Sequence, residues 1–294
     1  MTIKSEKPSS GMRVYNPHKA GLPNLPGYFR ELWTRRDFAM ELSNTNLRAS
    51  NTNTFLGQLW LVINPLLLAA VYFLLVMVIS GGARVEGGFQ DGLQVFARIC
   101  AGLFFFFYVT GTISAAATSV SGAGGLILNM SFPKMLLIMS QAHLALRRFI
   151  PSLVVYLVIH IAAGLPWTWH MLWLPVYVVL GTLLGIGLGA VVATWNVYFR
   201  DTSQFLPYFI RIWLYLSPVL YTREHFLGTS ICSAIGPWVN LNPLFSLVGG
   251  WGDVLQGEPS DGTGLLIATA WALLMVVVGV LYFISREREF AVRL

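Results

Sequence analysis

Charged residues are scarce in this chain of 294 residues. Lys, Arg, Asp and Glu together make up 11% of it, whereas 55% is hydrophobic. Soluble domains carry about 25% charged residues, so a water-soluble fold of this size could not cover its surface. Lipid as solvent instead favours an apolar exterior. The composition therefore predicts an integral membrane protein.

Motifs for catalysis and metal binding are missing as well. There is no GxxxxGK(S/T) phosphate loop, which excludes that mode of ATP binding. There is no HExxH or GxSxG motif, and the five histidines show no metal-binding spacing. Cys100 and Cys232 form neither a disulfide framework nor a CxxC pair. We therefore expect no catalytic residue, metal or cofactor in this chain.

Acidic residues are almost absent from the long apolar segments. A carrier coupled to protons or sodium usually needs an intramembrane Asp or Glu. Their scarcity argues against ion coupling, so the energy for any transport must come from elsewhere.

Six segments are apolar and long enough to cross a bilayer, since a helical span needs about 20 mainly apolar residues. They cover residues 60–80, 97–120, 149–164, 171–194, 204–221 and 265–284. The predicted fold class is all-α integral membrane, with six transmembrane helices within residues 55–294. The glycines at 181, 185, 187 and 189 are expected to let neighbouring helices approach closely.

Positive charge lies mainly on one side of these spans. Of the 19 Lys and Arg residues, only Arg84, Arg98 and Arg223 fall on the side opposite the two termini. The positive-inside rule then places both termini in the cytoplasm and the chain in the cytoplasmic (inner) membrane. The net charge of +6 suits anionic membrane lipid, and we expect no nucleic acid as partner. The first 24 residues lack the apolar core of a signal peptide. Residues 1–27 are expected to form a flexible cytoplasmic tail.

Residues 28–54 form neither a plain span nor a plain loop. Over residues 28–42 (YFRELWTRRDFAMEL), apolar and charged residues recur at helical spacing. This predicts an amphipathic interfacial helix, followed by a polar linker to residue 54. A helix that packs on a partner protein is the alternative, and both can hold.

Two shorter apolar segments lie between predicted spans. In residues 222–264, Asn242 can cap a helix that begins at Pro243 and ends at Gly257, which predicts a re-entrant helical pair on the external side. Residues 124–140 are apolar and interrupted by Pro133. They are either the frayed end of a span or a short helix that docks on a cytoplasmic partner.

Several motifs occur in an order typical of one transporter family. They are RRD at 35–37, FLGQLW at 55–60, NPLL at 64–67, Asn129 with FPK at 132–134, RD at 200–201, SPV at 217–219 with Tyr221, and LNPL at 241–244. Residues 28–294 thus resemble the permease subunits of polysaccharide ABC exporters, the group of Wzm and of the teichoic-acid and capsule permeases. The polar stretch at 43–54 departs from the basic stretch more usual there. The chain looks most similar to actinobacterial galactan or O-antigen-type exporters.

The resemblance implies a homodimeric permease bound to two copies of an ABC ATPase subunit, which would hold ATP and Mg. It implies a cargo of glycan linked to a polyprenyl diphosphate. The residues expected to couple to the ATPase are Asn129, Phe132, Pro133 and Lys134. The residues expected to form an external re-entrant gate are Asn242, Pro243 and Trp251.

A polysaccharide needs a channel wall of hydrogen-bonding groups and flat aromatic faces, and this chain is 14% aromatic. The candidate lining residues are Trp60, Tyr72, Phe104, Phe107, Tyr108, Arg211, Tyr215 and Tyr221. Aromatic rings that face lipid are the alternative. The lipid diphosphate needs cations near the cytoplasmic leaflet, and Arg35, Arg36 and Arg48 are placed for this. The alternative for these arginines is contact with anionic headgroups.

Two other functions fit part of the pattern. An ABC permease for a drug or small lipid would share the six spans but would not need so many aromatic residues. A membrane enzyme of lipid-linked glycan assembly would need reactive acids at the cytoplasmic boundary, where Asp201 stands alone.

Overall fold

The computed structural model describes residues 23–50, 57–79, 88–222 and 238–293, and over these ranges the chain is helical with no strand. Five of the described helices are long and apolar enough to cross a membrane. They are α3 (Trp60–Ile79), α4 (Phe89–Gly122), α6 (Met135–Ala162), α7 (Leu174–Tyr198) and α12 (Gly262–Arg286). The predicted all-α, multi-pass membrane fold is confirmed to this extent.

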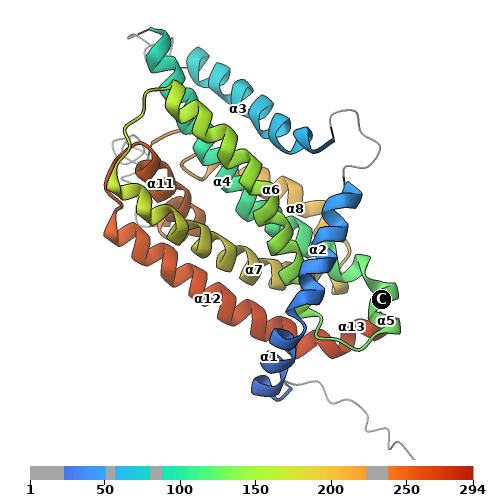
Figure 1. Cartoon of the computed structure of the whole chain (residues 1–294). Helices are drawn as coiled ribbons and strands as arrows, with labels where there is room; N and C mark the ends of the chain where they lie inside the picture. Colours follow the sequence, from blue (N-terminus) through green and yellow to red (C-terminus); the bar gives the residue numbers. More distant parts are fainter. Residues whose placement is uncertain (1–22, 51–56, 80–87, 223–237, 294) are drawn as a thin grey trace, which may run out of the picture.

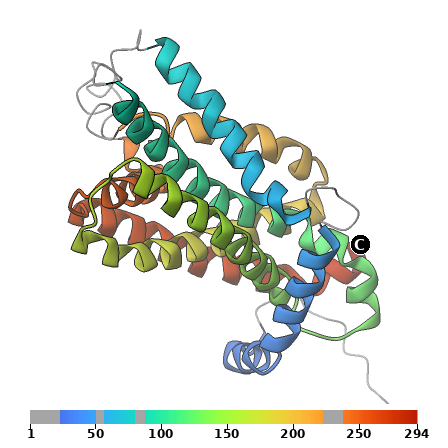
Figure 2. The same ribbon diagram turned by 45° about the horizontal axis from the view of Figure 1, so that its top comes forward.

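The long helices pack as a bundle. α7 packs against both α4 and α12, and α6 packs against α4 (Figure 1). α3 lies along one side of the bundle, against α4 and α6 (Figure 2). Short 3-10 turns precede or follow three of these helices, at Gly57–Leu59, Trp169–Trp173 and Glu287–Glu289.

Shorter helices gather at one end of the bundle, here called the basal end. They are α1 (Leu25–Thr34), α2 (Arg36–Ser50), α5 (Gly124–Asn129) and α13 (Phe290–Arg293). α2 packs against α6, and α13 contacts both α5 and α7. α11 (Pro243–Leu255) lies at the other end, against α12, α4 and α7.

Glycine makes the contact between α7 and α12 possible. A Cβ atom added at Gly279 would lie 2.0 Å from the carbonyl oxygen of Gly187. A Cβ atom added at Gly187 would lie 2.3 Å from the carbonyl carbon of Met275. Backbone therefore meets backbone at this crossing, as small residues at membrane helix interfaces permit. The predicted close approach at the glycines of residues 181–189 is confirmed.

The predicted fifth span differs from the structure. Its place is taken by α8 (Asp201–Tyr215), and turns follow to Ser217 and beyond. Fifteen residues extend about 22 Å as a helix, which is less than the ~30 Å hydrocarbon core of a bilayer. Pro218 disfavours helical backbone at the residue before it, which explains the early end. The count of six spans is therefore not confirmed.

The predicted third span began too late. α6 begins at Met135 and not near residue 149, so the apolar run at 135–140 and Arg147 with Arg148 belong to the helix. Met135 and Leu136 are buried beside Phe283 and Phe290, in a cluster at the basal end. Of the two alternatives for residues 124–140, residues 135–140 are thus the end of a span, whereas Gly124–Asn129 form the short helix α5.

The predicted amphipathic helix over residues 28–42 is in fact two helices, with a break at Arg35 (φ −101°, ψ 17°). α2 continues to Ser50, so the predicted polar linker is helical as far as that residue. Residues 51–54 lie outside the described residues, as do 223–237 of the predicted re-entrant pair. An interfacial position for α1 and α2, and a re-entrant one for α11, stay predictions.

Candidate functional site

The loop between α5 and α6 is fixed by buried side chains. Phe132 is 5% exposed, and its ring centroid lies 5.3 Å from that of Phe38 on α2. Pro133 is buried too. Asn129 and Ser131 remain exposed, and the Asn129 amide donates to the carbonyl of Gly125 in its own helix at 2.8 Å. The four predicted coupling residues thus form one well-packed loop with an exposed edge.

A buried carboxylate holds this loop to α1 and to the end of α12. Glu287, 7% exposed, accepts a hydrogen bond from the backbone N–H of Lys134 at 2.8 Å. The Lys134 ammonium lies 3.7 Å from the same carboxylate oxygen. The Tyr28 hydroxyl donates to the other oxygen of Glu287. Buried charges in proteins are paired and hydrogen-bonded, because an unpaired one is costly. We call Tyr28, Lys134 and Glu287 the basal junction.

Tyr28 takes part in this junction as a neutral hydrogen-bond donor. Burial raises the pKa of Tyr28 above its ordinary value of 10.0, and the Glu287 carboxylate raises it further. The phenol therefore keeps its proton near neutral pH. Its oxygen also accepts from the N–H of Met135 at 3.4 Å, the first residue of α6.

The three arginines predicted to contact a lipid diphosphate have different surroundings. Arg35 donates to the carbonyl of Ser131 at 2.7 Å and pairs with Glu31 at 3.1 Å, so it helps to fix the α5–α6 loop. The Arg36 guanidinium lies 4.6 Å from the centroid of the Trp33 ring. Arg48 is exposed in the last turn of α2. The structure does not bring the three together, and their contact with lipid stays a prediction.

An exposed face of α3 and α8 carries three of the predicted channel-lining residues, Tyr72, Arg211 and Tyr215. The hydroxyl groups of Tyr72 and Tyr215 are 3.5 Å apart, and their rings meet edge to face. Arg211 is exposed one turn before Tyr215. These three residues form a surface with polar groups on an apolar background. Trp60 is 39% exposed at the start of α3, three turns before Tyr72. Tyr221 is half-buried in the turns after α8.

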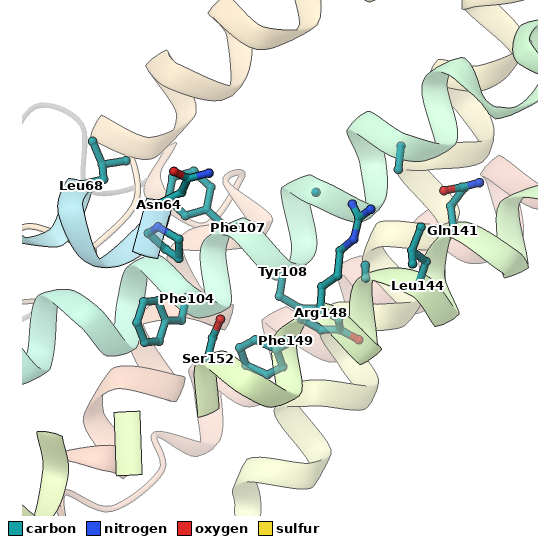
Figure 3. A pocket seen from close by; sticks show the side chains of 14 residues that line it. Asn64, Leu68, Phe104, Phe107, Tyr108, Gln141, Leu144, Arg148, Phe149 and Ser152 are labelled. Carbon is teal, nitrogen blue, oxygen red and sulfur yellow. The ribbon is translucent and has the colours of Figure 1, made fainter. Parts of the chain in front are cut away.

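The other predicted lining residues pack inside the chain. Phe104 and Tyr108 are buried, and Tyr108 stacks on Phe149 of α6 with centroids 4.7 Å apart. The Tyr108 hydroxyl lies 2.5 Å from that of Thr182. Phe104, Phe107 and Tyr108 line a pocket between α3, α4 and α6 (Figure 3). A role in a channel stays a prediction for all eight residues.

The residues predicted for an external gate lie on α11 or at its start. The Asn242 side chain caps the helix by accepting from the N–H of Leu244 at 3.1 Å, as the sequence predicted. The same side chain accepts from the Trp213 indole at 2.7 Å and donates to the carbonyl of Leu216 at 3.0 Å. Pro243 is the first helical residue. Asn242 therefore joins the end of α8 to the start of α11.

Trp251 anchors the other face of α11 in the core. Its ring stacks on Phe105 with centroids 4.5 Å apart and an interplanar angle of 8°. Its indole N–H donates to the carbonyl of Ala101 at 3.1 Å. The burial of one tryptophan removes about 150–250 Å² of surface from solvent. A moving gate at this position would have to carry α4 with it, and a gating role stays a prediction.

Three residues that matter to this geometry are not among the predicted site residues. Tyr28 is one apolar position among several in its segment, and Glu287 is one acid in a mostly basic C-terminal segment. Arg148 directly precedes the predicted span at 149–164, although it projects into the pocket of Figure 3. An acid between two arginines (RER at 286–288) directly after an apolar span is a signal that could have drawn attention to Glu287.

Comparisons with known proteins identify relatives of the chain. The family model ABC2_membrane, described as ABC-2 type transporter, matches residues 41–250, well over half of the chain. The chain is 27% identical over 264 residues to the O-antigen export system permease protein RfbA of Myxococcus xanthus, covering 89% of the chain and 97% of that protein. It is 24% identical over 259 residues to an RfbA permease of Klebsiella pneumoniae, covering 87% and 94%. A second RfbA permease from that organism is 21% identical over 259 residues.

Proposed function

The chain belongs to the ABC-2 type transporter family, and we propose that it exports a polysaccharide linked to a polyprenyl diphosphate across the cytoplasmic membrane. The glycan would be of the galactan or O-antigen type. ATP hydrolysis in a separate nucleotide-binding subunit drives the export. The observation that carries this proposal is the similarity to RfbA permeases, which extends over at least 94% of each relative. These relatives are named as permeases of O-antigen export. Like these relatives, the chain is a transport permease and not an enzyme.

In this proposal the basal end faces the cytoplasm, and both termini lie there. The distribution of Lys and Arg supports this, since Arg35, Lys134 and Arg286 all lie at the basal end. α8 and the turns up to Tyr221 complete a sixth crossing. α11 enters the membrane from the external side and returns without crossing, which its length of 13 residues supports.

The α5–α6 loop docks on the ATPase subunit and receives its movement. The exposed edge of the loop at Asn129 and Ser131 supports this role, because a docking segment must be accessible. The basal junction supports it further, since Glu287 and Lys134 tie the loop to the end of α12. A displacement of the loop is then passed to α1, α6 and α12 together.

Two copies of the chain build the pathway, with the exposed face of α3 and α8 turned toward it. The paired hydroxyl groups of Tyr72 and Tyr215 support this orientation. Lipid chains offer no hydrogen bonds to such groups, whereas a glycan does. The cation of Arg211 on the same face is costly against hydrocarbon and favourable in a hydrated channel.

Depletion of the protein in its native cells tests the proposed function. We expect polyprenyl-diphosphate-linked glycan to accumulate on the cytoplasmic side while surface glycan falls. The lipid extracts and the surface polymer are analysed from the same culture. Normal surface glycan after depletion contradicts the proposal, and accumulation of a small lipid or drug without any glycan defect favours the alternative permease.

A further inference from the structure

The pocket of Figure 3 lies between α3, α4 and α6. Its volume is about 340 Å³, within the range of roughly 300–1,000 Å³ that is usual for ligand sites. α4 contributes aromatic rings, and α3 contributes one turn around Asn64 and Pro65. α6 contributes the polar Gln141, Arg148 and Ser152 beside apolar side chains. The lining is therefore mainly apolar, and most of its polar groups come from α6.

Arg148 is the one cation among the residues that line this pocket. In Figure 3 its guanidinium projects from α6 toward α4. Its Nε atom is buried and has no hydrogen-bond partner among the described residues. The lining contains no Asp or Glu, so no acid there neutralises the charge. Arg148 as a whole is half-buried. Burying part of a guanidinium without a partner is costly, and an anion in the pocket would lower that cost.

The adjacent arginine, by contrast, has a partner within the protein. Arg147 is exposed and donates to the side chain of Asn44 on α2. α2 is the polar helix proposed to lie at the membrane interface, so Arg147 and Arg148 lie near headgroup depth. From Arg148 the pocket reaches Phe104 and Ser152 further from the basal end, and Gln141 nearer to it.

We propose that this pocket binds the phosphate headgroup of a membrane lipid from the proposed cytoplasmic leaflet. The guanidinium of Arg148 binds the phosphate as an anion in a charge-assisted contact. The lipid chain extends along the aromatic wall of Phe104 and Phe107. Arginine suits this role because its planar group is weakly hydrated and matches phosphate geometry. The depth of the site rests on the membrane orientation proposed above.

Native mass spectrometry of the purified full-length chain tests the proposal. The protein is released from detergent micelles that contain phosphatidylglycerol, decaprenyl phosphate or, as a lipid without phosphate, diacylglycerol. We expect the wild-type chain to retain one phosphate-bearing lipid and to retain diacylglycerol no better than detergent. The lipid that is preferred distinguishes a bilayer phospholipid from a carrier lipid, and either result supports the site.

Two variants test the pocket, one by removing its charge and one by filling its volume. Arg148→Gln removes the charge, and we expect about tenfold weaker retention, as the loss of one charge-assisted hydrogen bond predicts. Gly111→Leu fills the pocket and keeps the arginine. A Cβ atom at Gly111 meets no atom within 4 Å, so this helical position accepts a side chain. If Arg148→Gln fails to fold, Gly111→Leu still decides the matter.

Matched controls are available on the same helices. Arg147→Gln removes the neighbouring charge, and Gly122→Leu adds the same side chain at another open position of α4. Both should retain lipid as the wild type does. The proposal is overturned if the wild type retains no phosphate lipid, if diacylglycerol is held equally well, or if neither pocket variant differs from its control. Because no glycan is present, such a result would leave the proposed export function untouched.

Discussion

The hydroxyl group of Tyr28 donates a hydrogen bond to the carboxylate of Glu287, 259 positions further along the chain. The same carboxylate accepts from the N–H of Lys134, just before α6 begins. One buried acid therefore joins α1, the α5–α6 loop and the end of α12. A displacement of the α5–α6 loop would therefore act on both α1 and α12.

Removal of the Tyr28 hydroxyl should weaken this junction. We expect Tyr28→Phe to lower stability by about 1.5–3 kcal/mol, the usual contribution of a hydrogen bond to a charged group. Thermal unfolding of the purified protein in detergent measures the change as a lower midpoint. Tyr208→Phe on the exposed face of α8 is the control, and it should change little. Equal effects of the two substitutions would show that the junction contributes nothing.

The contribution of Tyr28 should also depend on pH at the alkaline end. Burial and the nearby carboxylate raise the pKa of Tyr28 above its ordinary value of 10.0. A group with a raised pKa contributes stability that is complete below the pKa of the unfolded chain and is lost as pH rises toward the folded value. The stability difference between wild type and Tyr28→Phe should therefore stay constant from about pH 7 to about pH 9 and shrink above about pH 10. A difference that shrinks already below about pH 8 would contradict this assignment.

The contact between α7 and α12 should tolerate no side chain at its centre. In Gly279→Ala the new Cβ atom would meet the Gly187 carbonyl at 2.0 Å, so the two helices must separate. We expect a loss of about 3 kcal/mol and little folded protein after extraction. Gly262→Ala at the start of the same helix meets no atom within 4 Å and should be neutral. Monodisperse yield by size-exclusion chromatography compares them, and a normal yield of Gly279→Ala would refute the close contact.

The proposed orientation can be tested by labelling with a membrane-impermeant maleimide. Ser131→Cys is introduced in a chain that carries Cys100→Ala and Cys232→Ser. We expect it to react in inside-out vesicles and not in intact cells. Phe89→Cys, at the 84% exposed start of α4, is the matched site at the opposite end and should react from outside. Labelling of Ser131→Cys in intact cells would mean that the basal end faces outward.

Features that depend on local chemistry were predicted well from the sequence. The Asn242 cap needs only an amide and a following proline, and the close contact at Gly187 needs only small residues at helical spacing. The four long helices other than α6 lie near their predicted positions, because long apolar runs are a strong signal.

Features that depend on tertiary contacts were missed. The sequence left open whether residues 124–140 end a span or form a docking helix, and the packing of residues 135–140 in the cluster with Phe283 and Phe290 makes them part of α6. The stop after Tyr215 is different, because Pro218 is a local signal that the hydropathy of residues 204–221 outweighed. The basal junction combines residues from three distant parts of the chain, so its geometry could come only from the fold.

Transport by the purified system tests the central proposal most directly. The permease is reconstituted in liposomes with its ATPase subunit and a lipid-linked polysaccharide, and a glycan-specific lectin measures how much glycan crosses the membrane. We predict that glycan crosses only when both the ATPase subunit and ATP are present. Passage at the same rate with the permease alone, or none with the complete system, would contradict the proposal that this chain exports glycan with energy from a separate ATPase.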